Sequence, residues 1–481
     1  MNADGDDRDP APAEVGEGWR RGRRNRTILL RALAGAVVLA VIIVLGTWVR
    51  TDRLTDGDAF GSDLTAIMNR IAAENADVMK KHPDDFVTVI AVFPMTGALT
   101  DIALNRESIR HGLEGIHLAQ VWRNQQPSSP PYVRVLVASD GPDDWEPTVE
   151  AIKARTADER IVAVTGLGAS TDATWKTIQS LSASRYAMVS AILTSDELTG
   201  YRGLARVAAL NSEQAQAGVA HARQVNPALR AVVVKDLNPA DSYVKTLAQS
   251  YDSSLTGKER EMELSFDSAA RFSGTVLDVI AERICNSAAN TVLYAGRSEQ
   301  LPALMMALSQ REACVRRRIT VITGDDASEM NQKVDKIMWG DPSIRLFYTA
   351  LAHPAGLTLP DSPVLNAAKV RFVGGDPNSF ERMFPHESLA DGMAIMHHDA
   401  MFVVVETAKM FAREQDVPSP QDMANMLTSG TVVVRGASGT ISIGEGGTRE
   451  TKDVPILQLI PDGTSAFSGW VTVTGGQAAR S

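Results

Sequence analysis

Two kinds of apolar pattern alternate along the chain from residue 86 onward. Short continuous runs rich in valine and isoleucine, such as FVTVIAVFP at 86–94, alternate with windows in which apolar residues recur every three or four positions, such as SIRHGLEGIHLAQVWRN at 108–124. The continuous runs predict strands buried on both faces, and the periodic windows predict amphipathic helices. Together they predict an α/β protein whose parallel sheets are covered by helices on both sides.

The number of these units decides between one sheet and two. Further strands are predicted at 133–140, 161–166, 187–192, 230–236, 291–296, 319–324 and 345–351, and further helices at 62–81, 145–158, 172–184, 212–225, 275–285, 298–312 and 400–415. Eight or more such units exceed one comfortable open sheet, so we expect two doubly wound, Rossmann-like lobes. After the last helix, short glycine-punctuated strands predict a return of the chain across both lobes.

An uncharged run of 18 residues, ALAGAVVLAVIIVLGTWV at 32–49, lies between Arg31 and Arg50. As a helix it would be about 27 Å long, close to the thickness of a bilayer's hydrocarbon core. Five arginines in RRGRRNR at 20–26 predict a cytoplasmic N-terminus. We therefore expect a single-pass type II protein of the plasma membrane with its globular part extracytoplasmic. The alternative is a cleaved signal peptide, which the bulky GTWVRTD junction disfavours.

These patterns give an expected domain organisation. Residues 1–26 are expected to form a disordered cytoplasmic tail, 27–50 a transmembrane signal anchor, and 51–85 a juxtamembrane linker whose helix lifts the globular part off the bilayer. The first lobe is expected to comprise 86–205 with 345–432, the second lobe 206–344 with 433–475, and 476–481 a flexible tail.

Composition and charge narrow the function. The 48 basic and 58 acidic residues give a net charge of −10, which disfavours nucleic-acid binding. Two cysteines exclude a disulfide-dense scaffold and a four-thiolate zinc site. Cys285 ends one predicted helix and Cys314 follows the next, and both helix ends lie at one sheet edge, so we expect a disulfide between them. Two free thiols are the alternative.

Motifs of catalysis are missing from the sequence. There is no phosphate-binding GxxxxGK[ST], no GxSxG and no nucleophilic cysteine with a placed histidine. In TGLGAST at 165–171, Thr171 stands at the third glycine position of a dinucleotide fingerprint. One histidine and aspartate cluster lacks the spacing of a metal motif; it comprises His386, Asp391, His397, His398 and Asp399. We therefore expect no enzyme activity, no cofactor and no metal.

Five segments occur in a distinctive order: FPMTGALTDIALNRESIRHGLEGIHLAQ, VRVLVASDGPDDWEPTVEAIKARTADERIVAVTGLGAST, SDELTG, HHDAMFVVVETA and GASGTISIGEGGTR. This order resembles that of the type I periplasmic binding proteins, the branched-chain amino acid and amide receptors of ABC importers. The resemblance spans about residues 86–475. It implies two lobes joined by three crossovers, with ligand bound in the cleft between them.

The resemblance also implies ligand contacts. Ser170, beside Thr171 at a helix N-terminus, falls on the family's carboxylate-binding serine, and Thr194 falls on a second ligand-contacting position. Asp325 matches the acidic residue that meets the ligand's ammonium group, with Asp326 as its neighbour. A helix cap at Ser170 and a turn at Thr194 are the plainer alternatives.

Other positions depart from the family. Arg297 and Ala240 stand where aromatic residues are common, which argues against a branched-chain amino acid as the ligand. An arginine in the cleft would favour an anionic group, while a solvated position at the start of a helix is its alternative. Asp196 replaces a proline, and Ile443 replaces a phenylalanine.

The sequence thus favours a membrane-anchored solute-binding protein that captures a small polar ligand, amino-acid-like or anionic, and serves an ABC permease. A sensor that signals through a membrane partner is a second hypothesis. The third hypothesis is a scaffold of the same fold that binds no ligand, and the departures from the family pattern described above favour it. A cleft filled by its own side chains would support the scaffold.

Overall fold

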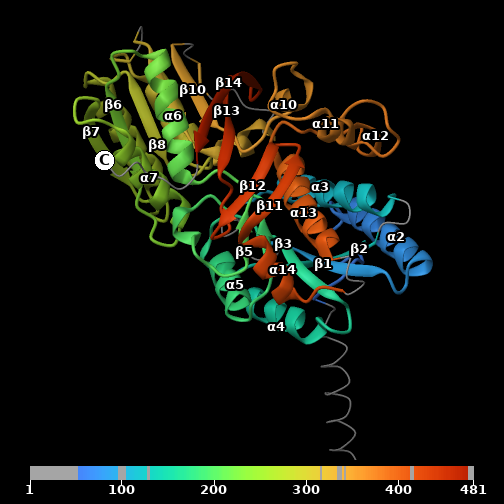
Figure 1. Ribbon diagram of the computed structural model, residues 1–481. Coiled ribbons are helices and arrows are strands. Elements are labelled where there is room, and N and C mark those ends of the chain that lie inside the picture. The colour runs from blue at the N-terminus through green and yellow to red at the C-terminus, as the bar shows by residue number, and fades with distance from the viewer. Residues whose placement is uncertain are drawn as a thin grey trace, which may run out of the picture. The chain divides into compact units, whose positions relative to one another are not determined.

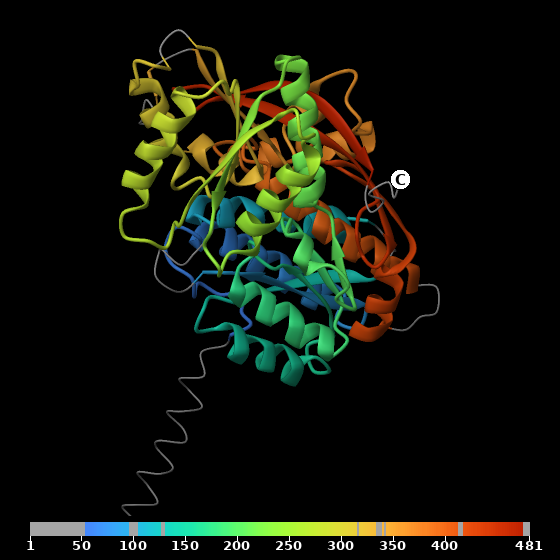
Figure 2. The same cartoon turned by 90° about the vertical axis from the view of Figure 1, so that its left-hand side faces the viewer.

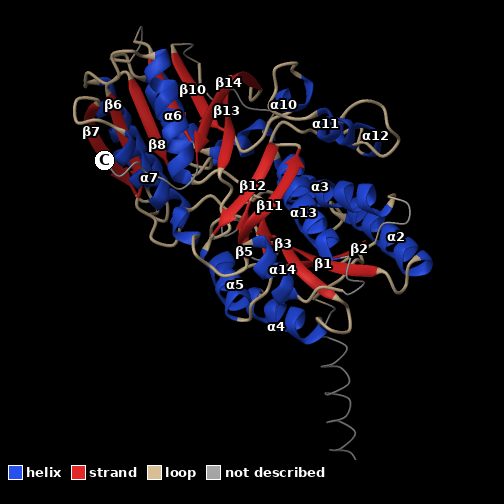
Figure 3. Ribbon diagram, viewed as in Figure 1, coloured by secondary structure: helices blue, strands red, loops and turns tan. Residues whose placement is uncertain are grey.

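The computed structural model describes residues 53–95, 104–126, 130–314, 317–332, 339–340, 343–411 and 417–474. The predicted cytoplasmic tail and anchor, and the tail at 476–481, lie outside these residues. Within the described part of the chain, no helix is both long and apolar enough to cross a membrane. The described strands form sheets of five, seven and two strands (Figures 1 and 3).

The five-stranded sheet has the order β2-β1-β3-β4-β5, and all its pairs are parallel. Its strands are β1 (Phe86–Phe93), β2 (Tyr132–Ser139), β3 (Ile161–Gly166), β4 (Met188–Ser190) and β5 (Leu204–Arg206). One face carries α2 (Thr65–Lys81), α3 (Arg106–Asn124), α13 (Met393–Phe411) and α14 (Pro420–Leu427), and the other carries α4 (Trp145–Arg155) and α5 (Asp172–Ala183). We call this sheet and its helices the first lobe.

The seven-stranded sheet has the order β14-β13-β10-β9-β8-β6-β7. Figure 2 shows its green-to-yellow and red elements gathered apart from the blue strands of the five-stranded sheet. Its strands are β6 (Ala231–Asp236), β7 (Arg260–Phe266), β8 (Thr291–Ala295), β9 (Ile319–Thr323), β10 (Ile344–Thr349), β13 (Thr451–Leu459) and β14 (Ser465–Thr474). One face carries α6 (Asn211–Val225) and α7 (Ser242–Ser254), and the other carries α8 (Ser273–Cys285) and α9 (Leu301–Gln310). We call this sheet and its helices the second lobe.

The remaining elements connect the lobes or cap them. They are the hairpin of β11 (Ser429–Gly436) and β12 (Gly439–Glu445), the short helices α10 (Ala355–Thr358), α11 (Asn366–Phe372) and α12 (Phe380–Met383), and the 3-10 segments η1 (Asp196–Leu198) and η2 (Asp325–Gln332). The described chain passes between the two large sheets three times, after β5, after β10 and after β12. This agrees with the three crossovers that the resemblance implies.

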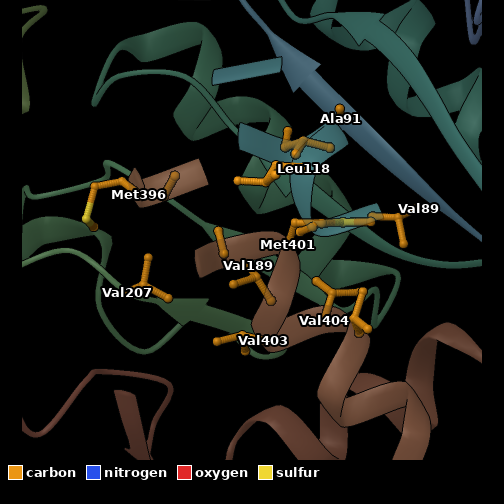
Figure 4. Packing of buried hydrophobic residues seen from close by; sticks show 14 of the residues in the cluster. Val89, Ala91, Leu118, Val189, Val207, Met396, Met401, Val403 and Val404 are labelled. Atoms are coloured by element: carbon orange, nitrogen blue, oxygen red, sulfur yellow. The ribbon is translucent and has the colours of Figure 1, made fainter. Parts of the chain in front are cut away.

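The buried strands explain why the sequence forms this architecture. Along β1, Val89 and Ala91 pack in one core while Ile90 and Val92 pack in the core on the opposite face. A parallel strand covered on both faces carries mostly apolar side chains on both of them, which is the pattern read from the sequence. Figure 4 shows Val89 and Ala91 in the core to which Met401 of α13 also belongs.

Two expectations are wrong. The helix predicted at 62–81 as a spacer is α2, whose Ile67, Met68 and Ile71 are buried in the core of the first lobe. Its apolar stripe is covered by protein, so this helix is part of the lobe. The strand predicted at 345–351 was expected in the first lobe, but β10 pairs with β9 and β13 in the second. Its run of apolar residues predicts burial in a sheet without specifying which sheet.

A disulfide joins Cys285 at the end of α8 to Cys314 after α9, with 4.9 Å between their Cα atoms. Replacing both cysteines with serine is expected to lower the free energy of unfolding by about 3 to 4 kcal/mol, because the bond closes a loop with a sequence separation of 29. Urea denaturation of the two forms measures this. An unchanged midpoint of urea denaturation in the serine variant would contradict this prediction. So would a reductant that destabilises the serine variant as much as the parent protein.

Candidate ligand-binding site

A small cavity lies where the carboxyl ends of strands from both lobes meet. The first lobe contributes Ser170 after β3 and Thr194 after β4, and the second contributes Arg297 after β8 and Asp325 after β9. Ligand sites of open α/β sheets occur at such strand ends. The cavity therefore brings together four of the five residues expected to bind ligand. Its volume is only about 20 Å³, the space of about one water molecule.

The turn between β3 and α5 sets the position of Ser170. Gly166 and Gly168 have φ angles of +87° and +50°, and a Cβ on Gly168 would lie 2.8 Å from Pro94. Only glycine fits there without strain. Thr171 is the N-cap of α5, and its hydroxyl accepts a hydrogen bond from the Thr174 backbone N–H. Ser170 is therefore not the cap of this helix; its hydroxyl accepts from the Ser195 N–H at 3.3 Å.

Arg297 is held by two aspartates of its own lobe. Its guanidinium donates to both carboxylate oxygens of Asp241 at 2.7 and 3.0 Å, and to Asp326 at 2.7 Å. It also lies over the ring of Tyr243, 4.3 Å from the centroid. The charges of the two aspartates outweigh burial and raise its pKa. These two ion pairs compensate the charge of Arg297, which argues against the expectation that it attracts an anionic ligand.

Two residues of this cluster were missed from the sequence. Asp241 caps α7, and Tyr243 begins the same helix. The loop was interpreted as lacking an aromatic because Ala240 stands in the family's tyrosine position, but Tyr243 supplies a ring three residues later. Both residues stand in the segment PADSY, which directly follows a predicted strand and its turn, so their position at the sheet edge could have been predicted.

Two further carboxyl groups face this cavity from the second lobe. Asp325 accepts a hydrogen bond from the side chain of Gln214 at 2.8 Å, and burial raises its pKa to about 7. Glu329 reaches the first lobe, where it accepts hydrogen bonds from the Ser108 hydroxyl at 2.7 Å and from the side chain of Asn105. Burial raises the pKa of Glu329 to about 8. Glu329 gave no signal in the sequence.

A larger cleft of about 1010 Å³ adjoins the cavity and shares Leu104, Arg297, Asp326 and Glu329 with it. Thr171 lines this cleft rather than the cavity. The charged residues described along it are mostly acidic: Asp140, Asp172, Asp241, Glu299, Asp326 and Glu329 against Arg106, Lys176 and Arg297. Asp140 is fully buried, neither of its carboxylate oxygens has a hydrogen-bond partner, and burial raises its pKa to about 7.

The histidine and aspartate cluster of the sequence is divided between separate contacts. His397 Nδ1 lies 2.9 Å from the Met393 carbonyl, and His398 Nδ1 lies 2.9 Å from Asp399 Oδ1. Asp399 also accepts from the backbone N–H groups of Ala437 and Ser438. It therefore fixes the β11–β12 turn against α13.

Two lobes joined by three crossovers, with a cavity at facing strand ends, define the type I periplasmic binding protein fold, and comparison with solved structures confirms it. One of them is the leucine-binding protein LivK of Thermotoga maritima, which is 18% identical, has a TM-score of 0.57, and is matched over 81% of this chain and 99% of its own. Another is LivJ of Streptococcus pneumoniae in complex with isoleucine, with 14% identity, a TM-score of 0.60, and coverage of 81% and 100%.

Ligands differ among the proteins of this fold. A solute-binding protein of Rhodopseudomonas palustris, solved with 3,4-dihydroxybenzoic acid, is 13% identical with a TM-score of 0.56 over 82% of this chain and 99% of that one. Comparison of the sequence with protein-family models and with curated proteins gave no match.

Proposed function

We propose that the protein is a solute-binding protein that captures a small ligand with an ammonium group, amino-acid-like in form, between its two lobes. The observation that carries the proposal is the convergence of Ser170 and Thr194 from one lobe with Asp325 from the other on a single cavity. Hydroxyls and backbone N–H groups suit a carboxylate, and a carboxylate side chain suits an ammonium group.

The charge of the site favours this ligand over an anion. Arg297 is engaged by Asp241 and Asp326, and among the described residues neither Asp325 nor Glu329 forms an ion pair. A ligand ammonium group would supply the cation for such a pair. The apolar side chains of Leu104, Ile192 and Met393 also line the cavity and would cover an apolar part of the ligand.

The small cavity requires that the lobes open before a ligand enters. Ligand pockets typically measure about 300 to 1,000 Å³, whereas this cavity holds about 20 Å³. Opening would break contacts such as that between Glu329 and Ser108, as in hinge closure of two domains. The same small volume favours a second candidate function, a scaffold of this fold that binds no small molecule.

We further propose that residues 32–49 anchor the protein in the plasma membrane, with the lobes extracytoplasmic, where the protein would deliver its ligand to an ABC permease. The support is the uncharged run bounded by Arg31 and Arg50. Several proteins that share the fold are substrate-binding proteins of ABC transporters.

The experiment is thermal unfolding of the full chain against amino acids, amides, polyamines and dicarboxylates. A ligand at 100 times its dissociation constant is expected to add about 2.7 kcal/mol of stability, a shift of a few degrees. The shift should be much smaller in Asp325→Asn and persist in Asp158→Asn, which alters an exposed carboxylate outside the cleft. If no compound shifts the transition of the folded chain, the scaffold replaces the receptor.

Ligand affinity should depend on pH in one direction. Because burial raises the pKa of Asp325 to about 7, protons compete with the ligand ammonium for this carboxylate below that pH. Affinity is expected to fall by about tenfold per unit between pH 6 and pH 5 and to level off only above the raised pKa of Glu329, about 8. Calorimetric titration at each pH measures this, and Asp325→Asn should reduce the dependence. Affinity that rises on acidification would contradict it.

A further inference from the structure

A second cluster of ionisable side chains lies in the first lobe, between α3 and the loop that precedes α13. His111 and Glu114 are three residues apart on α3 and therefore share one helix face. Glu387 reaches them from the loop. One ligand atom from each of the three lies within 4.8 Å of the others. The sequence gave no sign of this cluster, because Glu387 is distant along the chain.

The orientation of His111 is fixed in the way typical of a metal-binding histidine. Its Nδ1 lies 2.7 Å from the carboxylate of Asp391, and its Nε2 points to Glu387 at 3.1 Å. A carboxylate on one ring nitrogen holds the tautomer and leaves the other nitrogen as the ligand. His111 is fully buried, so the ring cannot turn away to solvent.

Glu114 provides the second, independent observation. Only 3% of this residue is exposed, and its Oε2 is buried without a hydrogen-bond partner. Burial and the charge of Glu387 raise its pKa to about 8. An unpartnered carboxylate oxygen in the interior is costly unless a cation or a proton satisfies it.

The cluster is rich in carboxylates. Among the described residues, Glu107, Glu114, Glu387 and Asp391 surround His111, and one arginine, Arg110, lies 2.9 Å from Glu387. A divalent ion bound between these carboxylates would be attracted by each of them.

We propose that His111, Glu114 and Glu387 bind a divalent transition-metal ion. One imidazole and two carboxylates suit Zn²⁺ or Mn²⁺. Around Zn²⁺, neighbouring ligand atoms lie about 3.4 Å apart, so side-chain shifts of about 1 Å close the site. The side chain of Glu387 is 23% exposed and provides the route from solvent.

The proposed site adjoins the ligand cavity without belonging to it. The carboxylate of Asp391 accepts a hydrogen bond from the backbone N–H of Met393 at 3.0 Å, and Met393 lines the cavity. The ion would therefore fix the start of α13, one wall of the cavity. The inference does not depend on the proposed function, since a scaffold could equally hold the ion.

The test is calorimetric titration of the chelator-treated full chain with ZnCl₂ and, separately, with MnCl₂. One ion is expected to bind per chain. Glu114→Gln, which keeps the shape and removes the charge, and Glu387→Gln should each weaken binding by about 10- to 100-fold. Glu150→Gln, an exposed carboxylate on α4, should leave it unchanged. A thermal transition for each variant establishes that it is folded.

Two results of the metal titration would contradict the proposal. If wild type and the two site variants bind the ions equally, or if folded wild type binds neither ion at 1 mM, the proposal is wrong. Should Glu114→Gln fail to fold, Glu387→Gln decides, because its side chain is partly exposed and tolerates the change. Visible absorption of Co²⁺-loaded protein gives a second readout, with imidazole and oxygen ligation expected in wild type and absent from both variants.

Discussion

Replacing Lys452 with methionine is expected to lower the free energy of unfolding by about 3 to 5 kcal/mol. Lys452 at the start of β13 and Glu213 in the first turn of α6 are each 3% exposed and form an ion pair of 2.5 Å. The strand β13 follows the third crossover between the lobes, and the helix α6 follows the first. The ion pair therefore links two of the segments that connect the lobes. Without the lysine, the buried carboxylate of Glu213 loses its ion-pair partner and keeps only the longer-range attraction of Arg206 and Arg449.

A double variant that removes both charges tests whether the loss of stability comes from the carboxylate left without its partner. Lys452→Met combined with Glu213→Gln should recover part of the loss, because the carboxylate that lost its ion-pair partner is then neutral. Lys81→Met is the matched control, since its pair with Asp77 is exposed on both sides and should contribute little to stability. Chemical denaturation of the four proteins measures this. A loss under 1 kcal/mol for Lys452→Met would contradict the account of the crossovers.

Replacing Arg297 with methionine is expected to destabilise the protein by a similar 3 to 5 kcal/mol, roughly, because Asp241 and Asp326 would then repel each other in a mostly buried site. Combining it with Asp241→Asn and Asp326→Asn should restore most of the stability. Arg311→Met, which removes a largely exposed pair with Glu282, is the control. If Arg297→Met lowers the free energy of unfolding no more than Arg311→Met does, the two aspartates do not hold Arg297. Arg297 would then again be a candidate ligand-binding residue.

The sequence predicts the architecture well because burial leaves a direct pattern. Strands such as β1 and β3 are buried along their whole length and mostly apolar, with Thr88 and Thr165 as exceptions, and the helices between them keep an apolar stripe. The strands β5 and β7 were not predicted: β5 is three residues long, and the pattern REMELSF of β7 is mostly polar because this strand lies at the sheet edge. The sheet to which β10 belongs depends on tertiary pairing, which a local pattern does not contain.

The ligand site was predictable only in part. Ser170, Thr194 and Asp325 follow predicted strands, so topology alone brings them to one cleft. The role of Arg297 was not predictable, because its aspartates lie 56 and 29 positions away in the chain. Glu329 and Glu114 acquire their importance only through burial and through partners from other elements.

The central claim is that the cavity between the lobes recognises an ammonium group through Asp325. The most direct measurement is calorimetric titration of the full chain, at pH 8, with the amino acid that gives the largest thermal shift and with its N-acetyl derivative. The account predicts that the amino acid binds, that the N-acetyl form binds at least tenfold more weakly, and that Asp325→Asn abolishes the difference. Equal binding of both compounds, or no binding of amino acids or amines by the folded chain, would contradict it.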